Sequence, residues 1–388
     1  MDIEKKNAAA VAEIFKQQFN ATPLVVRSPG RVNIIGEHTD YNEGFVLPAA
    51  IDKAIYVAVG KRSDAEVHLY AVDFKERITV AIADIKPSNN WSTYVLGVVD
   101  QLIKRGHLVG GFNLVLDGDV PLGAGLSSSA AVECATVFAL NEVFGFAIDK
   151  MEMVKIAQIA EQTYSGVMCG IMDMFASMFG KKDQVIKLDC RSLAYEYKPF
   201  SLHGYKIVLF NTNVKHSLAS SAYNERRQQC EQGVAWIKAQ HPQVNSLRDV
   251  TMQMVEQIIA PKDATIYLRC KFIVAEIDRL LTGCNDLDKG DIVALGKKMF
   301  ATHEGLSKEY AVSCKELDYL VDAVKHNPDV LGSRMMGGGF GGCTINLVKV
   351  EAIEALSAQI SFAYQAQFNI ELSTYITEIE NGTCIMVV

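Results

Sequence analysis

The chain has 388 residues, 49% of them hydrophobic and 21% charged, which is the composition of an ordinary globular protein and excludes a disordered one. Its net charge of −7 excludes the broad positive field of a nucleic-acid-binding protein, so any polyanion must be met by a local site. At roughly 100–200 residues per domain, this length predicts two domains.

The nine cysteines are scattered, and no two of them have CxxC spacing. This argues against a zinc site, and a disulfide framework is not expected in so long a chain, so free thiols in a reducing cytosol are the simpler interpretation. The first residues form an amphipathic helical pattern without the order of a signal peptide. No uncharged apolar run reaches the roughly 20 residues of a membrane span. We expect a cytoplasmic protein that binds neither membrane nor nucleic acid.

The first part of the chain predicts one helix followed by strands. Residues 24–29 are typical of a strand, and Pro29-Gly30 predicts a turn at its end. Two β-branched runs at 55–60 and 66–72 flank the polar segment KRSDA, which predicts a hairpin. The remaining elements predicted in this part are a helix at 1–19, a strand at 77–85, a helix at 91–106 and a strand at 112–118.

The rest of the chain alternates between helical and extended patterns. Helices are predicted at 127–144, at 149–164 and from Gly170 onward. Residues 216–310 are rich in helix formers, and strands are predicted at 185–190, 205–212, 343–348 and 368–377, with a helix at 350–368. We therefore expect an α/β protein of the α+β type, with domains at residues 1–195 and 196–388.

The stretch PLGAGLSSSAA at 121–131 follows a predicted strand and opens a predicted helix. Gly123 and Gly125 permit close backbone approach, and serine is a good N-cap. A helix start with free N–H groups attracts anions, although a strand–glycine–helix turn also occurs for packing reasons alone. The loop has no Walker lysine, so a triphosphate bound here would need a metal, with Ser129 as a candidate ligand assisted by an acid.

Three other stretches have unusual compositions. Asp173 lies in the apolar run CGIMDMF, where a carboxylate must be paired or must face solvent. MMGGGFGGC at 335–343 has five glycines, which indicates either a backbone crowded by a ligand or a flexible hairpin. PGRVNIIGEHTDY at 29–41 sets charged side chains beside apolar ones, which indicates either a polar pocket or a solvated loop.

Together these stretches resemble the GHMP small-molecule kinases and, within them, the galactokinases. SPGRVNIIGEHTDYN is similar to the galactokinase signature, PLGAGLSSSAA to the ATP loop and SRMMGGGFGG to the third, glycine-rich motif. CGIMD, LDCRSL and NTNVKHSLASSAYNERRQQC are also similar, and the order holds from about residue 20 to residue 345. The resemblance implies a two-domain fold with the active site between the domains. It implies a ribosomal-protein-like N-terminal domain with a mixed sheet, and a C-terminal domain with an antiparallel sheet and helices.

The resemblance also implies roles for individual residues. Arg31 and Asp173 match the catalytic pair, and Ser129 and Glu161 match the magnesium-associated residues. The positions that match galactose ligands are Glu37, His38, Asp40, Gly170 and Tyr223. The positions that match ATP contacts are Pro121, Leu122, Gly123, Ala124, Gly125, Leu126, Ser127, Ser128, Ser129 and Ala130, with Trp91 and Tyr94 near the adenine. Met174 and Met336 depart from the family pattern, where glutamine and threonine are usual, and we expect them to alter affinity or pocket polarity.

The function implied is ATP- and Mg²⁺-dependent phosphorylation of galactose at the anomeric hydroxyl, the first step of galactose catabolism, by a monomeric enzyme. Two alternatives remain open. One is a kinase of N-acetylgalactosamine or another sugar, and the other is a sugar and ATP sensor without catalysis. The intact serine run of the ATP loop argues against the sensor.

Overall fold

The structure is a computed structural model, and it describes residues 3–214 and 219–388. Its largest sheet has six strands in the order β13-β1-β3-β6-β4-β5. This sheet is mixed, because β4 and β6 run parallel whereas the other neighbours are antiparallel. Its strands are β1 (Leu24–Asn33), β3 (Pro48–Lys61), β4 (Glu66–Ala71), β5 (Glu76–Ala81), β6 (Phe112–Gly118) and β13 (Cys384–Met386).

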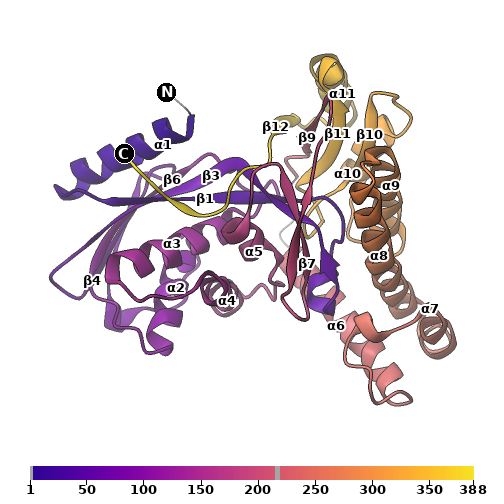
Figure 1. The fold of residues 1–388 in the computed structure, drawn as a ribbon, viewed down its shortest axis with the longest axis horizontal. Helices are drawn as coiled ribbons and strands as arrows, with labels where there is room; N and C mark the ends of the chain where they lie inside the picture. The colour runs from indigo at the N-terminus through magenta and orange to yellow at the C-terminus, as the bar shows by residue number, and fades with distance from the viewer. Residues whose placement is uncertain (1–2, 215–218) are drawn as a thin grey trace.

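Helices cover both faces of the six-stranded sheet, so its strands β1 and β3 are almost entirely buried. In Figure 1, α1 lies on one side of β1 and β3, and α2, α3 and α4 lie on the other. The predicted helices are confirmed here, with one to three residues' difference at most of their ends. They are α1 (Ile3–Phe19), α2 (Ser92–Lys104), α3 (Ser128–Phe144), α4 (Lys150–Ala160) and α5 (Met172–Phe179).

The predicted hairpin across KRSDA is wrong. β3 and β4 follow one another in sequence, but β6 lies between them in the sheet and pairs with both. The N–H of Arg62 in this segment donates to the carbonyl of Gly111, immediately before β6, at 2.8 Å. The first five residues of β6 are buried, so the strand gains most from a central place between two neighbours. The pattern of apolar residues predicted the strands but not their partners.

The predicted turn at Pro29-Gly30 is a β-bulge inside β1. The pairing of β1 with β3 shifts register between Pro29 and Arg31, and the strand continues to Asn33. Glycine is required at position 30, because a Cβ there would lie 2.8 Å from the carbonyl oxygen of Leu126. The N–H of Arg31 donates to that same oxygen at 3.1 Å. The bulge therefore joins β1 to the glycine-serine loop and directs the Arg31 side chain.

A second sheet of four antiparallel strands has the order β10-β11-β9-β12, as expected for the C-terminal part. A third, small sheet has the order β2-β7-β8. The strands of both are β2 (Phe45–Val46), β7 (Gln184–Asp189), β8 (Tyr195–Pro199), β9 (Tyr205–Asn211), β10 (Val330–Met335), β11 (Cys343–Lys349) and β12 (Ser373–Thr377). β2, β8, β10 and β13 were not predicted. β13, which follows all of these strands in sequence, pairs with β1 in the first sheet.

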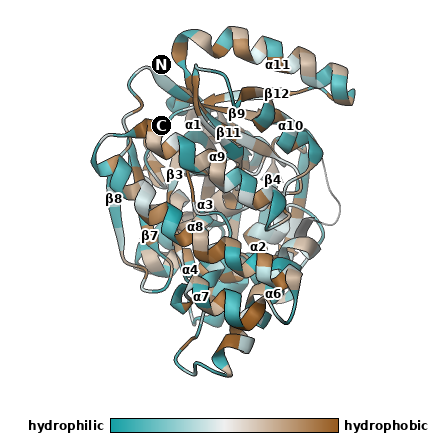
Figure 2. Cartoon of the chain, turned by 90° about the vertical axis from the view of Figure 1, so that its right-hand side faces the viewer, coloured by the Kyte–Doolittle hydropathy of each residue, from teal (hydrophilic) through white to brown (hydrophobic). Residues whose placement is uncertain are grey.

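Helices dominate residues 219–324, as the composition predicted. Figure 2 shows hydrophilic and hydrophobic residues mixed along outer helices such as α8, α9 and α11, which is typical of helices with one buried face. The helices are α6 (Ala219–Lys238), α7 (Met252–Met254), α8 (Ala264–Asp288), α9 (Ile292–Lys308), α10 (Lys315–Val324) and α11 (Ile353–Phe368). Shorter helical segments are η1 (Asp40–Asn42), η2 (Ile82–Asp84), η3 (Glu161–Ser165), η4 (Leu247–Asp249), η5 (Val255–Ile259) and η6 (Val350–Ala352).

Two sequence expectations concern the chain as a whole. Within residues 3–214 and 219–388, no helix is long and apolar enough to cross a bilayer. The boundary at 195/196 stays a prediction. The galactokinase-like stretch at 211–230 includes residues 215–218, which lie outside the described residues.

Candidate active site

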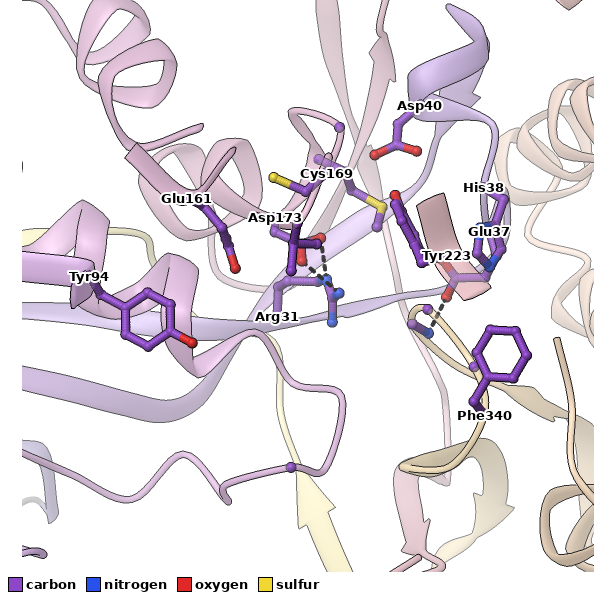
Figure 3. Close-up of a pocket in the computed structure, with 17 residues that line it drawn as sticks. Arg31, Glu37, His38, Asp40, Tyr94, Glu161, Cys169, Asp173, Tyr223 and Phe340 are labelled. Carbon is purple, nitrogen blue, oxygen red and sulfur yellow. Dashed lines mark hydrogen bonds and ion pairs between the residues drawn. The ribbon is translucent and has the colours of Figure 1, made fainter. Parts of the chain in front are cut away.

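A cavity of about 530 Å³ lies where β1, α5 and the glycine-rich segment after β10 meet. All seven residues predicted to be catalytic or sugar-binding line it. Figure 3 shows Arg31 and Asp173 at its centre, with Tyr94 and Glu161 on one side and Glu37, His38, Asp40 and Tyr223 on the other. The lining residues that the sequence did not assign to a substrate or metal are Val167, Cys169, Met172, Gly337, Gly338, Gly339 and Phe340.

Arg31 and Asp173 form a two-pronged ion pair. Nε of Arg31 donates to Oδ1 of Asp173 at 2.8 Å, and Nη2 donates to Oδ2 at 2.9 Å. The third guanidinium nitrogen, Nη1, donates to the carbonyl of Gly125 at 2.6 Å. Burial lowers the pKa of Arg31, but the charges of Asp173, Glu37 and Asp40 and the hydrogen bond to Asp173 together outweigh it, so this pKa lies above its ordinary value. The cation is therefore fixed between the carboxylate and the glycine-serine loop.

Glu37 is buried, and hydrogen bonds hold both of its carboxylate oxygens. Oε1 accepts from Nη1 of Arg334 at 3.0 Å and from the N–H of Gly337 at 2.8 Å. Oε2 accepts from Nδ2 of Asn33 at 3.0 Å. Because one of these donors comes from β1 and the others come from β10 and the loop after it, Glu37 links the two parts of the chain that enclose the cavity.

His38 lies beside Tyr223 and Tyr310, with ring centroids 5.3 Å and 4.9 Å away. Its Nδ1 is 2.8 Å from the hydroxyl of Tyr41, while its buried Nε2 has no hydrogen-bond partner among the described residues. Burial lowers the pKa of His38 to about 4, so the ring is neutral at pH 7. An unpaired ring nitrogen in a cavity wall suits a ligand hydroxyl.

Asp40 lies against Gly170, and this contact explains the glycine. A Cβ at position 170 would lie 1.8 Å from Oδ2 of Asp40, so a larger residue would displace the carboxylate. Burial, and then the nearby Asp173 charge, raise the pKa of Asp40 to about 7. The carboxyl group of Asp40 thus lines the same cavity as Asp173 and is held close against Gly170.

The raised pKa of Asp40 predicts a pH-dependent gain in stability for Asp40→Asn. Between the ordinary carboxyl pKa of 3.8 and about 7 the folded protein binds more protons than the unfolded chain, so stability falls as pH rises through this window. The asparagine does not titrate, so the variant does not lose this stability as the pH rises. We expect the stability gain of the ligand-free variant to grow from near zero at about pH 4 to a few kcal/mol, about 4 at most, at pH 8. Thermal unfolding across this pH range measures the difference, and a constant difference would contradict the expectation.

The glycine-serine loop ends at α3 with its amides free. Ser127 occupies the N-cap position in a left-handed conformation, but its hydroxyl does not cap the helix. The hydroxyl donates instead to Oδ2 of Asp173, so the predicted capping role is wrong. Within the described residues, the first N–H groups of α3 therefore have no capping side chain, and this end of the helix favours anions.

A second cavity, of about 280 Å³, opens beside the start of α3 and shares Tyr94 and Gly123 with the first. Trp91, Leu122, Ser128 and Ser129 also line it. The indole N–H of Trp91 donates to Oε2 of Glu76 at 2.8 Å, which fixes the ring at the cavity wall. The other predicted ATP residues, which line neither cavity, are Pro121, Ala124, Gly125, Leu126, Ser127 and Ala130. The side chains of Ala124, Leu126 and Ala130 are buried, so these residues offer only backbone groups to a ligand.

Between the two cavities, Oγ of Ser129 donates to Oε1 of Glu161 at 2.9 Å. Burial raises the pKa of Glu161 to about 7. Behind them, Glu133 is fully buried, and neither of its carboxylate oxygens has a hydrogen-bond partner in the described part of the chain. A hydroxyl together with carboxylates, two of whose oxygens have no hydrogen-bond partner, is a set of ligands that suits a hard divalent cation. No group of three potential metal-ligating His, Cys, Asp or Glu side chains occurs in residues 3–214 and 219–388, so such a cation would need oxygens from the ligand as well.

Met174 and Met336, the two departures from the family pattern, are buried in the core and line neither cavity. Their side chains therefore do not set the polarity of the pocket, which contradicts that part of the expectation, whereas an effect on affinity stays a prediction. Met336 contributes its backbone to the site, since its carbonyl oxygen lies near Gly125.

The fold and the two joined cavities define a small-molecule kinase of the GHMP class. Models of the N-terminal and C-terminal GHMP kinase domains match residues 93–181 and 285–365. A mevalonate kinase structure shares the fold, with a TM-score of 0.64 over 92% of this chain and 99% of its own at 19% identity.

Closer relatives identify the family within that class. A model of the galactokinase galactose-binding signature matches residues 13–61. The galactokinase of Thermotoga maritima is 41% identical over 92% of this chain and 99% of its own length. The structure of Lactococcus lactis galactokinase complexed with galactose has a TM-score of 0.93 at 32% identity, and covers 97% of this chain and 99% of its own. The chain belongs to the galactokinase family.

Proposed function

We propose that this protein transfers the terminal phosphoryl group of ATP to the anomeric hydroxyl of galactose. The observation that carries the proposal is the Arg31–Asp173 pair, which stands between a cavity lined by Glu37, His38 and Asp40 and the free amides of α3. The first cavity has acceptors arranged for a polyol. The helix start and the second cavity suit a nucleotide with its phosphates.

In the reaction, the sugar hydroxyl lies beside Asp173, which orients it and accepts its proton. The hydroxyl oxygen forms a new bond to the terminal phosphorus. The bond from that phosphorus to the bridging oxygen breaks, and ADP leaves with the electron pair. Arg31 donates hydrogen bonds at the point where negative charge is shared between the attacking and transferred groups. The amides of α3 and the backbone of the loop hold the remaining phosphate oxygens.

Ser129 and Glu161 are the residues that would hold Mg²⁺, which supplies neutralisation of phosphate charge. The pKa of Glu161, raised by burial, means that the cation would stabilise the ionised form of this carboxylate. A monomeric state and a cytosolic location remain predictions from the sequence.

The identity of the sugar is tested by a coupled ADP-release assay over galactose, N-acetylgalactosamine, glucose and mannose. Galactose is expected to give the highest kcat/KM. We expect rejection of the epimers, because a displaced hydroxyl leaves the buried Nε2 of His38, which has no partner among the described residues, unpaired. Turnover of N-acetylgalactosamine without turnover of galactose would overturn the proposal, and sugar and ATP binding without any turnover would identify a sensor.

Glu161→Gln is expected to raise the magnesium concentration needed for half-maximal activity by roughly tenfold, because a neutral amide is a weaker ligand than a carboxylate. A magnesium titration at saturating ATP and galactose measures the shift. Glu142→Gln, at the far end of α3 on the surface, is the matched control and should leave the titration unchanged. An unchanged midpoint for Glu161→Gln would remove this residue from the metal site.

A further inference from the structure

His303 lies outside the cavity, yet the structure connects it to the cavity wall. It lies in α9 with 6% of its surface exposed. Its Nδ1 accepts a hydrogen bond from the backbone N–H of Met335 at 3.1 Å. Met335 ends β10, immediately before the glycine-rich segment that lines the cavity.

This N–H needs a partner outside the sheet. Among the described residues β10 is an edge strand that pairs with β11 alone, so half of its backbone groups face away from the ladder. Helix α9 covers this edge very closely, since a Cβ on Gly296 would lie 2.1 Å from the carbonyl oxygen of Leu331. His303 lies two turns further along the same face of α9 and so arrives beside Met335. The histidine satisfies a buried donor that no strand can reach.

The second ring nitrogen fixes the tautomer. Because a backbone N–H can only donate, Nδ1 of His303 must be unprotonated, and Nε2 carries the hydrogen. Nε2 lies 3.2 Å from Oδ1 of Asp318. The hydroxyls of Ser313 and Ser307 donate to Oδ1 and Oδ2 of Asp318 at 2.6 Å and 3.0 Å, so the carboxylate is held in place. The ring is thereby oriented with its acceptor nitrogen toward β10.

The residues on either side of Met335 hold the Glu37 carboxylate. Arg334 precedes it and Gly337 follows it, and both donate to Oε1 of Glu37. Gly337 and Gly339 have positive φ angles of 82° and 87°, a conformation with little intrinsic preference, so the position of this segment depends on its anchors. The bond from Met335 to His303 is the anchor on the helix side.

Thr302, which precedes His303 in α9, supports the segment that contains Glu37. Oγ1 of Thr302 donates to the buried carboxylate of Glu276 at about 3 Å. That carboxylate accepts from the N–H of Gly36, immediately before Glu37, at 2.9 Å. Two successive residues of one helix thus hold the segment containing Glu37 and the segment that binds it.

We propose that His303 is a positioning residue for the sugar, acting through the Met335 N–H to set the place of the Glu37 carboxylate. This inference rests on the proposed function, because it assigns Glu37 to the sugar. It concerns sugar affinity and not phosphoryl transfer, since neither His303 nor Met335 lines either cavity.

Three variants at one position test the role. In His303→Asn the amide oxygen replaces Nδ1 as the acceptor, whereas in His303→Gln the polar atoms replace Nε2, and His303→Leu removes both. We expect the KM for galactose to stay within twofold of the parent in His303→Asn. It should rise roughly tenfold in His303→Gln and His303→Leu, the effect of one lost buried hydrogen bond. The KM for ATP should change by less than twofold in all three, and His203→Asn on the surface is the control.

A merely structural role would give another pattern. The KM values of the three variants would then rise in the order in which their thermal stability falls, and the KM for galactose and the KM for ATP would rise together. Equal values for His303→Asn and His303→Gln, or unchanged galactose KM in His303→Leu, would also overturn the proposal. If the glutamine and leucine variants do not fold, Asp318→Ala provides the second test, because it removes the carboxylate that orients the His303 ring. It should raise the galactose KM several-fold and leave the ATP KM within twofold of the parent. Should the parent prefer another hexose, the proposed function fails, while the same comparison with that hexose still decides the role of His303.

Discussion

Asp173→Asn is expected to lower kcat by roughly 10³-fold, within the range for loss of a general base, while ATP still binds. The asparagine keeps one acceptor for Arg31 and the hydroxyl of Ser127, so the loop and α3 should stay in place. What it loses is the ability to take a proton from the sugar. The coupled ADP-release assay gives kcat, and calorimetry gives the affinity for ATP.

A control for Asp173→Asn is needed to show that a fall in kcat comes from the loss of the catalytic carboxylate and not from the loss of an arginine–aspartate ion pair as such. Arg62 and Asp64 form another forked pair, near the surface and away from both cavities. Asp64→Asn breaks it and should leave kcat within twofold of the parent. A near-normal kcat for Asp173→Asn would show that the carboxylate only fills space, and a loss of ATP binding would show that its main role is to hold the loop.

The local parts of the fold were predictable, because helices are specified by residues close in sequence. Residues 1–19 have their apolar positions at helical spacing, and residues 127–144 form a mostly apolar run without glycine or proline; α1 and α3 occupy them within two residues at each end. The pairing of strands was not predictable from the same pattern. A hairpin between β3 and β4 would satisfy the local alternation of apolar residues as well as the observed strand order does. In the structure the strand that lies between β3 and β4 is β6, which begins about 50 residues after β3 ends, so the local pattern could not indicate it.

In the site, too, the residues within local motifs were predictable, whereas contacts between segments distant in sequence were not. Arg31, Glu37, Asp40 and Asp173 stand in motifs and were found by resemblance, and the structure brings them together around one cavity. The residues that hold them were missed, because their partners are distant in sequence. Arg334 is the clearest case, since its place directly before the glycine-rich run was a signal, but nothing in the sequence indicated that Glu37 is its partner.

The burial of Arg334 makes it the position where a substitution should have the largest effect on stability. The side chain has no exposed surface, and it donates to Oε1 of Glu37, to the carbonyls of Asn33 and Ile34, and to its neighbour Met335. Arg334→Met has a similar length but leaves Glu37 as a buried anion without its cation. Breaking a buried pair in this way costs about 3–5 kcal/mol. We expect a clear fall in the thermal midpoint and loss of galactose binding.

A double-mutant cycle with Glu37→Gln shows which interaction causes the loss of stability in Arg334→Met. If the uncompensated charge of Glu37 is the cause, then adding Glu37→Gln to Arg334→Met should recover part of the stability, although galactose binding stays lost. The half-exposed Arg191, paired with Glu43, is the matched control, and Arg191→Met should cost less than about 1 kcal/mol. Additive effects at 37 and 334 would mean that the charge is not the cause. Arg334 would then act by filling the space between β1 and β10 and by satisfying the two carbonyls of β1 and its extension.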